Sequence, residues 1–213
     1  MCGPTGLCLT GLAPAQYGER QDKGRKKYLD AVHDVFGPEN RAKFATMRIG
    51  ILSDTHSYLD DRILHHLEGC AEIWHAGDIG SFEVLDGLSA VAPVRAVYGN
   101  IDDHRMRSTC PERLVWDCAG LRCAMVHIGG HPGRYAAGIG AWLEAERPDI
   151  FLCGHSHILR VERDARWGGL FINPGAAGTH GFHRMRTLLR MEVVEGEIRG
   201  MEAVELGLRG KIS

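Results

Sequence analysis

The chain has 213 residues and a formal net charge of -2 at pH 7, with 25 basic and 27 acidic side chains. Hydrophobic residues make up 44% and charged residues 24%, as in a globular protein with a sizeable core. This balance excludes a strong overall basic field, so nothing indicates bulk nucleic-acid binding. No apolar stretch approaches the roughly 20 residues of a membrane span, and the N-terminus lacks signal-peptide features. We therefore expect a cytoplasmic protein that does not associate with membranes.

The seven cysteines are odd in number and include no C-x-x-C pair. Some lie within apolar runs, such as Cys153 at the end of 150–153. This pattern favours small buried thiols in a reducing compartment over a disulfide framework.

Residues 1–46 differ in composition from the rest of the chain. Positions 1–18 hold four glycines and two prolines without apolar periodicity, so we expect disorder there. An apolar spacing over 27–36 predicts one short helix. Two interpretations remain open: a genuine extension whose helix docks on the domain, or a mis-assigned start upstream of Met47. The expected division is an N-terminal extension over 1–46, a domain over 47–206 and a C-terminal tail over 207–213.

After Met47, short apolar runs alternate with helical patterns. This alternation predicts βαβ units, and the tightly spaced strands near the C-terminus predict an antiparallel run, so the sheets are expected to be mixed. The expected strands are 49–52, 71–75, 94–98, 122–127 and 149–153, then 160–163, 169–172, 187–194 and 197–203. The expected helices are 62–69, 82–88 and 135–147.

Each of the first five expected strands ends at, or is followed within three residues by, an aspartate, asparagine or histidine. The carboxyl ends of strands in an open α/β sheet share one edge, where loops line a common crevice. We expect glycines at 77, 99 and 154 to let the backbone turn sharply as it leaves the strands. The side chains that the strand ends gather are Asp54, His56, Asp78, Asn100, His127, His155 and His157.

Two carboxylates, one amide oxygen and four imidazoles suit divalent ions such as manganese, iron, zinc or nickel. Seven ligands are too many for one ion that must also hold a substrate. Two ions that share a carboxylate leave positions open for water and a phosphate. Each motif alone is weak, because the same residues are common in turns. Gathering so many polar groups without a ligand would leave buried charges unpaired, so the set predicts a two-metal site.

The motifs Asp54-x-His56, Gly77-Asp78, Gly99-Asn100, His127 and Gly154-His155-x-His157 resemble, in this order, those of the calcineurin-like metallophosphoesterase superfamily. Their compact spacing and Asn173-Pro174-Gly175 are similar to its small YfcE-type phosphodiesterase branch. The resemblance covers residues 47–203. It implies an α/β (α+β) fold, a four-layer αββα sandwich of two mixed β-sheets flanked by helices.

The resemblance also implies roles for the seven residues. Asp54, His56, Asp78 and His157 would hold one ion, and Asp78, Asn100, His127 and His155 the other. His56, Asp78 and Asn100 would be catalytic, with a metal-bridging hydroxide attacking a small-molecule phosphoester in line. Manganese is the expected metal, with iron, zinc, nickel or magnesium as alternatives. The oligomeric state and the natural substrate are left open.

One position departs from larger members of the superfamily, which have a histidine directly after Gly-Asn. Ile101 stands there in this chain, as small-branch members also commonly lack that histidine. The proton donor to the leaving group is therefore unassigned. His104 or His131 is one hypothesis, and a solvated loop histidine is the alternative for each.

Other polar residues have two interpretations each. Asp102 either orients Asn100 or an imidazole, or only forms a turn. The basic loop with His180, His183, Arg184 and Arg186 either binds a substrate phosphate or is a solvated polar loop. His75, with His65 and His66, is expected to be structural or exposed.

Two rival functions remain. A phosphomonoesterase or nucleotide hydrolase would use the same metals. A metal-binding interaction scaffold would share the fold without catalysis, as is thought of a retromer subunit whose metal motif is degraded. The intact motif set favours catalysis.

Overall fold

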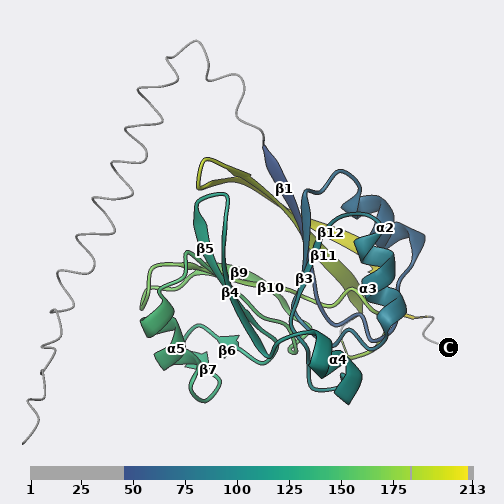
Figure 1. Cartoon of the computed structure of the whole chain (residues 1–213), viewed down its shortest axis with the longest axis horizontal. Coiled ribbons are helices and arrows are strands. Elements are labelled where there is room, and N and C mark those ends of the chain that lie inside the picture. The colour runs from purple at the N-terminus through teal and green to yellow at the C-terminus, as the bar shows by residue number, and fades with distance from the viewer. Residues whose placement is uncertain (1–45, 183, 211–213) are drawn as a thin grey trace, which may run out of the picture. The chain divides into compact units, whose positions relative to one another are not determined.

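The computed structural model describes residues 46–182 and 184–210. The predicted disorder and the helix over 27–36 therefore lie outside the described residues. None of the described helices is long and apolar enough to cross a membrane. In the described part, two five-stranded sheets are flanked by helices (Figure 1).

The first sheet has the strand order β12-β11-β1-β2-β3. Strands β1, β2 and β3 are parallel, with Ile51 opposite Trp74, whereas β11 pairs antiparallel with both β1 and β12. Its strands are β1 (Met47–Leu52), β2 (Glu72–His75), β3 (Val94–Ala96), β11 (Met185–Val194) and β12 (Glu197–Leu208). The parallel strands β1, β2 and β3 bring their carboxyl ends to one edge.

The second sheet has the order β4-β5-β8-β10-β9, with β5, β8 and β10 parallel and antiparallel strands at both edges. A separate two-stranded ribbon, β6 (Gly130–His131) and β7 (Arg134–Tyr135), follows β5. The five strands are β4 (Arg113–Cys118), β5 (Leu121–Val126), β8 (Ile150–Leu152), β9 (Leu159–Arg163) and β10 (Leu170–Pro174).

Four helices are described: α2 (Asp61–Leu67), α3 (Phe82–Ser89), α4 (His104–Thr109) and α5 (Ile139–Glu146). Asp60 caps α2 by accepting from the Ile63 amide, and Asp103 caps α4 by accepting from the Met106 amide. These carboxylates satisfy amide groups that the first helical turn leaves without a partner. Each helix then buries apolar residues against a sheet.

Three apolar clusters show how the layers pack. Ile51, Trp74 and Met125 belong to the cluster between the sheets, where Trp74 meets Trp116 edge to face with ring centroids 4.9 Å apart. A second cluster joins α2, α3 and α4 to the first sheet, and a third joins α5 to the second sheet. Figure 1 shows α2 and α3 beside β11 and β12, and α5 on the side of β4 and β9. The predicted four-layer sandwich of two mixed sheets is confirmed.

The sequence prediction was wrong or incomplete at several elements. The helix expected over 135–147 begins only at Ile139, because Arg134 and Tyr135 pair with β6. Gly138 precedes that helix with a φ of 77°, which a helix interior does not allow. Helix α4 and edge strand β4 were not predicted. Strand β12 continues to Leu208, so two residues assigned to the C-terminal tail belong to the sheet.

Candidate metal centre

The seven predicted ligands come together where five strands end. Asp54 and His56 follow β1, and Asp78 follows β2. Asn100 lies in the loop after β3, His127 directly follows β5, and His155 and His157 follow β8. Both sheets therefore contribute, although the sequence argument treated the strands as one series.

Two groups of carboxylate and imidazole atoms form at this edge, each with its ligand atoms within 4.8 Å of one another. Asp54, His56 and His157 make the first group, in which Asp54 Oδ1 lies 3.1 Å from His157 Nε2. Asp78, His127 and His155 make the second. We call these the first and second ligand groups.

Asn100 adds an amide oxygen to the second ligand group, because its Oδ1 lies 3.1 Å from His127 Nε2. The opposite nitrogen of His127, Nδ1, donates to the Ala76 carbonyl oxygen at 2.7 Å. This hydrogen bond fixes the tautomer that leaves Nε2 free to bind an ion.

Asp78 lies between the two groups. Its Oδ1 is 3.2 Å from His127 Nε2, and its Oδ2 is 3.7 Å from His56 Nε2. Oδ1 also accepts from the Ile101 amide at 3.1 Å. One carboxylate thus faces ligands of both groups, which is the geometry that a bridging ligand requires.

Buried ligand atoms without a hydrogen-bond partner indicate that the first ligand group fits a divalent ion. Asp54 Oδ1 and His56 Nε2 are buried and make no hydrogen bond within the described residues. Although His157 Nε2 is close to Asp54 Oδ1, their approach does not satisfy hydrogen-bond geometry. A buried polar atom without a partner costs about 1–3 kcal/mol. An ion between these atoms would remove that cost.

The first and second ligand groups differ electrostatically. Burial lowers the pKa of His56 and outweighs the attraction of Asp78 and Asp54. Burial acts in the same direction at His127, but the hydrogen bond with Asp78 and the charge of Asp54 raise its pKa overall. In the absence of ions, His127 therefore takes up positive charge more readily than His56.

Five of the seven residues have a left-handed backbone. Their φ angles are 55° at Asp54, 49° at His56, 53° at Asp78, 67° at His155 and 57° at His157. This conformation costs an L-residue roughly 1–2 kcal/mol. Strain of this kind persists only where the surrounding structure holds it, and it concentrates at functional sites.

The glycines act in two different ways, which corrects the expectation that all three allow sharp turns. Only Gly77 has a positive φ, at 92°. Gly99 is required for space, because a Cβ there would lie 2.0 Å from Asp78 Oδ1. Gly154 is similar, since its Cβ would lie 2.0 Å from Ser53 Oγ and 2.8 Å from Asp54 Oδ2.

Asp102 connects two of the ligand loops. Its buried carboxylate accepts from the amides of Ile79 at 3.2 Å, Gly80 at 2.7 Å and Gly99 at 2.7 Å. The expected contact with Asn100 or an imidazole is therefore replaced by three backbone contacts. Asp102 fixes the chain on both sides of the Asp78 carboxylate.

His75 is structural and completely buried. Its Nδ1 accepts from the Gly77 amide, so Nε2 carries the ring proton and donates to Thr55 Oγ1 at 2.9 Å. The Thr55 hydroxyl donates in turn to the Ile79 carbonyl oxygen at 3.0 Å. This chain of hydrogen bonds joins the loops after β1 and β2.

Arg209 is a site residue that the sequence analysis missed. It is 5% exposed, and its Nη1 donates to His157 Nδ1 at 3.0 Å and to the His180 carbonyl oxygen at 3.1 Å. It was assigned to the C-terminal tail, and no motif around it indicates a role. The continuation of β12 to Leu208 would have been the only signal.

The basic loop divides into residues with different positions. The His180 ring lies 5.1 Å from the ring of His56, so this residue reaches the centre. Arg184 is exposed, and its carbonyl oxygen accepts from the Arg209 amide. Arg186 is buried against Asp60, with Nη1 2.9 Å from its Oδ2, so it is neither solvated nor available to substrate. His183 lies outside the described residues.

The two histidines proposed as proton donors are both exposed. His104 begins α4, and His131 Nδ1 donates to the carbonyl oxygen of Pro132 at 2.9 Å. Neither has a described contact with one of the seven ligands. Ile101 is 45% exposed beside Asn100, so the position next to the second ligand group is apolar.

The fold and this centre define a two-sheet sandwich with a candidate dinuclear metal site at one edge. Residues 47–196 match the calcineurin-like phosphoesterase superfamily domain. The chain therefore belongs to the calcineurin-like phosphoesterase superfamily.

Curated relatives agree with this assignment, and solved structures share the fold. A probable metallophosphoesterase of Methanothermobacter thermautotrophicus is 30% identical over 143 residues, covering 61% of this chain and 77% of the relative. One of Methanocaldococcus jannaschii is 27% identical, covering 75% and 81%. An archaeal phosphodiesterase structure has a TM-score of 0.60 at 21% identity, covering 75% and 99%. Vacuolar protein sorting 29 of Cryptosporidium parvum also scores 0.60, at 19% identity, covering 78% and 100%.

The first prediction concerns the space that Gly99 leaves for Asp78. Gly99→Ala should weaken Mn²⁺ binding at least tenfold, about 1.4 kcal/mol, because the added methyl displaces the Asp78 carboxylate. Isothermal titration calorimetry would measure this. The control is Gly140→Ala in α5, where an added Cβ meets no atom within 4 Å. Wild-type affinity in Gly99→Ala would contradict the claim that the space at Gly99 positions Asp78 for ion binding.

The second prediction concerns the stability of the metal-free protein. Complete burial lowers the pKa of His75 to about 4, whereas the unfolded chain has an ordinary histidine pKa of 6.5. As pH falls from 6.5 to 4, the imidazole of residue 75 becomes protonated in the unfolded state but stays neutral in the folded state. This should remove on the order of 3 kcal/mol of stability.

His75→Gln should remove this part of the pH dependence, because an amide does not titrate. Urea unfolding of both proteins in chelator, from pH 7 to pH 4, would measure the difference. Parallel curves for the two proteins would contradict the proposed neutral, buried imidazole.

Proposed function

We propose that this chain is a phosphoester hydrolase with two divalent metal ions and that its preferred substrates are phosphodiesters. The observation that carries the proposal is the position of Asp78, whose two oxygens face His127 and His56 in different ligand groups. Membership of the calcineurin-like phosphoesterase superfamily supports the same reaction class. The relatives named probable metallophosphoesterases are consistent with it.

Each ligand residue has a proposed task. Asp54, His56, Asp78 and His157 would hold one ion, and Asp78, Asn100, His127 and His155 the other. Two such ions, when bound, lower the pKa of a coordinated water and stabilise the entering and leaving oxygens of an in-line displacement at phosphorus. His56 borders the substrate side beside His180 and would stabilise charge that develops on the phosphoryl oxygens.

Manganese is the proposed metal, because imidazole, carboxylate and amide oxygen ligands together suit first-row divalent ions. Iron, zinc, nickel and magnesium are alternatives, since availability selects the ion as much as the ligands do. A cytoplasmic location is also part of the proposal, in keeping with the five cysteines of the described chain, which are buried and form no disulfide with one another.

The preference for diesters has an electrostatic argument. The pocket beside the centre is lined by His155, Ser156, His157 and residues 179–182, with no arginine or lysine among them. A phosphodiester carries one negative charge, whereas a monoester carries close to two near neutral pH. Arg209 contacts His157 and His180 but does not line this pocket, so two bound ions would be the main cations on the pocket surface. A singly charged substrate then requires less additional compensation than a doubly charged one.

The third prediction concerns the shared carboxylate. Asp78→Asn should reduce the hydrolysis of bis(p-nitrophenyl) phosphate with Mn²⁺ at least a thousandfold, since an amide is neutral and a poor bridging ligand. The control is Asp61→Asn, an exposed residue of α2. Full activity in Asp78→Asn with two ions bound would contradict the proposed bridging role of Asp78.

The fourth prediction separates the proposed function from its rivals. With one p-nitrophenolate leaving group in common, ethyl p-nitrophenyl phosphate should be hydrolysed at least tenfold more efficiently than p-nitrophenyl phosphate, measured as kcat/KM. A reversed ratio would identify a phosphomonoesterase or nucleotide hydrolase. Two bound ions without turnover of either ester would instead favour an interaction scaffold.

A further inference from the structure

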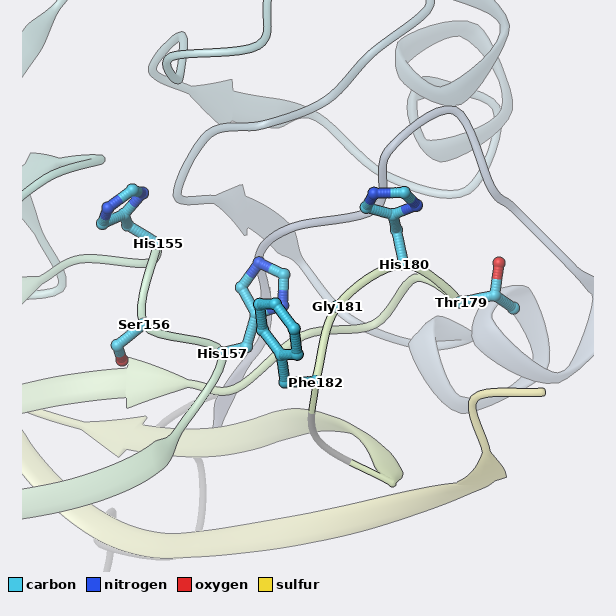
Figure 2. A pocket seen from close by; sticks show the side chains of 7 residues that line it. All are labelled: His155, Ser156, His157, Thr179, His180, Gly181 and Phe182. Atoms are coloured by element: carbon cyan, nitrogen blue, oxygen red, sulfur yellow. The ribbon is translucent and has the colours of Figure 1, made fainter. Parts of the chain in front are cut away.

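A pocket of about 520 Å³ lies directly beside the two ligand groups. The candidate ligands His155 and His157 line one side, and residues 179–182 line the other. Figure 2 shows the rings of His155, His157, His180 and Phe182 rising from the same side of their backbones, whereas Ser156 points away. The pocket is therefore an extension of the candidate metal centre, and the 179–182 loop forms its outer wall.

The 179–182 loop is held by contacts directly before it and within it. Before it, the Gly178 amide donates to the Asp54 carbonyl oxygen at 3.1 Å. Within it, Gly181 has a φ of 117°, and a Cβ there would lie 2.3 Å from His157 Nδ1. Arg209 binds the His180 carbonyl oxygen and His157 together. These contacts hold the loop directly against His157, which is a candidate metal ligand.

Directly after these contacts, the loop exposes one aromatic side chain. Phe182 is fully exposed, whereas Phe151 and Phe171 are at most 1% exposed in the core. A large apolar ring left in water next to a polar pocket gains nothing for folding. Its exposure becomes useful when a flat apolar group lies against it, because aromatic rings stack on planar ligands.

We propose that Phe182 forms a subsite for a planar aromatic group on the phosphoester, either a nucleobase or a simple aryl ring. The phosphoryl group would lie at the ligand groups, and the planar group would extend past His157 onto the Phe182 ring. The polar atoms of Thr179 and His180 border the same pocket and are available to substituents of that group. This subsite rests on the proposed function for its chemical role, but not for its ability to bind.

The test measures binding with ligands that cannot be hydrolysed. Phenylphosphonate is paired with methylphosphonate, and the 5′-methylenephosphonate analogue of AMP is paired with that of ribose 5-phosphate. Within each pair only the planar group differs. Calorimetry on the full-length, Mn²⁺-loaded wild type should show that at least one planar ligand binds at least tenfold more tightly than the non-planar ligand of its pair. The aryl and adenosine pairs distinguish the two sources of the ring.

Phe182→Ala should remove most of this preference and leave the non-planar ligands unchanged, while Phe182→Trp should retain it. Because Phe182 is fully exposed, none of these variants should impair folding. Val161→Ala is the matched control, since Val161 is an exposed apolar residue of β9 that does not line the pocket. Equal affinity for planar and non-planar ligands, or a preference that survives in Phe182→Ala, would overturn the subsite.

The same proteins separate this inference from the proposed function. If ethyl p-nitrophenyl phosphate is hydrolysed but planar ligands gain nothing, the subsite is wrong and the hydrolase stands. If no ester is hydrolysed but Phe182→Ala still weakens only planar ligands, the hydrolase is wrong and the subsite stands.

Discussion

The Asp78 carboxylate imposes the constraint on which the rest of the site depends. To face both His127 and His56, it must leave β2 on a left-handed residue and lie where a Cβ on residue 99 would be. The intrinsic backbone preference of aspartate does not satisfy these conditions without support from the surrounding chain. The backbone beside it is held by the Asp102 carboxylate, which accepts from the amides of Ile79, Gly80 and Gly99. A charged acceptor makes these hydrogen bonds stronger than neutral ones, so it can offset part of the local strain.

The same arrangement recurs around the site: a buried polar side chain holds the backbone of a loop, and that loop places a ligand. His75 joins the loops after β1 and β2 through Thr55, and Asp54 Oδ2 accepts from the His155 amide at 3.1 Å. Arg209 likewise holds the backbone of the 179–182 loop, which carries no candidate ligand but lines the pocket. Because each of these groups contacts two segments that are distant in sequence, the loops cannot shift independently. Rigid support of this kind is what a site needs if its ligand atoms are to stay within a narrow geometry.

The seven candidate ligands could be selected from the sequence because their signal is local: each lies at or just after the end of an apolar strand that can be recognised from a few residues. The alternation of strands and helices predicted mixed sheets, the family resemblance implied the four-layer sandwich, and the structure confirms both. The residues that support the site were harder. Asp102 lies one residue beyond Ile101 and resembles an ordinary turn, while its partners are more than twenty residues away at Ile79 and Gly80. Arg209 has no motif, since its role arises only when β12 pairs with β11 over its whole length.

Strand β12 shows how sheet architecture reaches the chemistry. It is an edge strand, paired only with β11, and its exposed residues alternate with residues packed against α2, such as Val204 and Leu206. This packing sets the direction in which the strand leaves the sheet, and Arg209 follows directly after Leu208. A guanidinium that donates to both His157 and His180 must approach from one direction, because its donors are planar and fixed. The position of the pocket wall is therefore determined by the register of the last strand pair, far from any residue that a motif search would select.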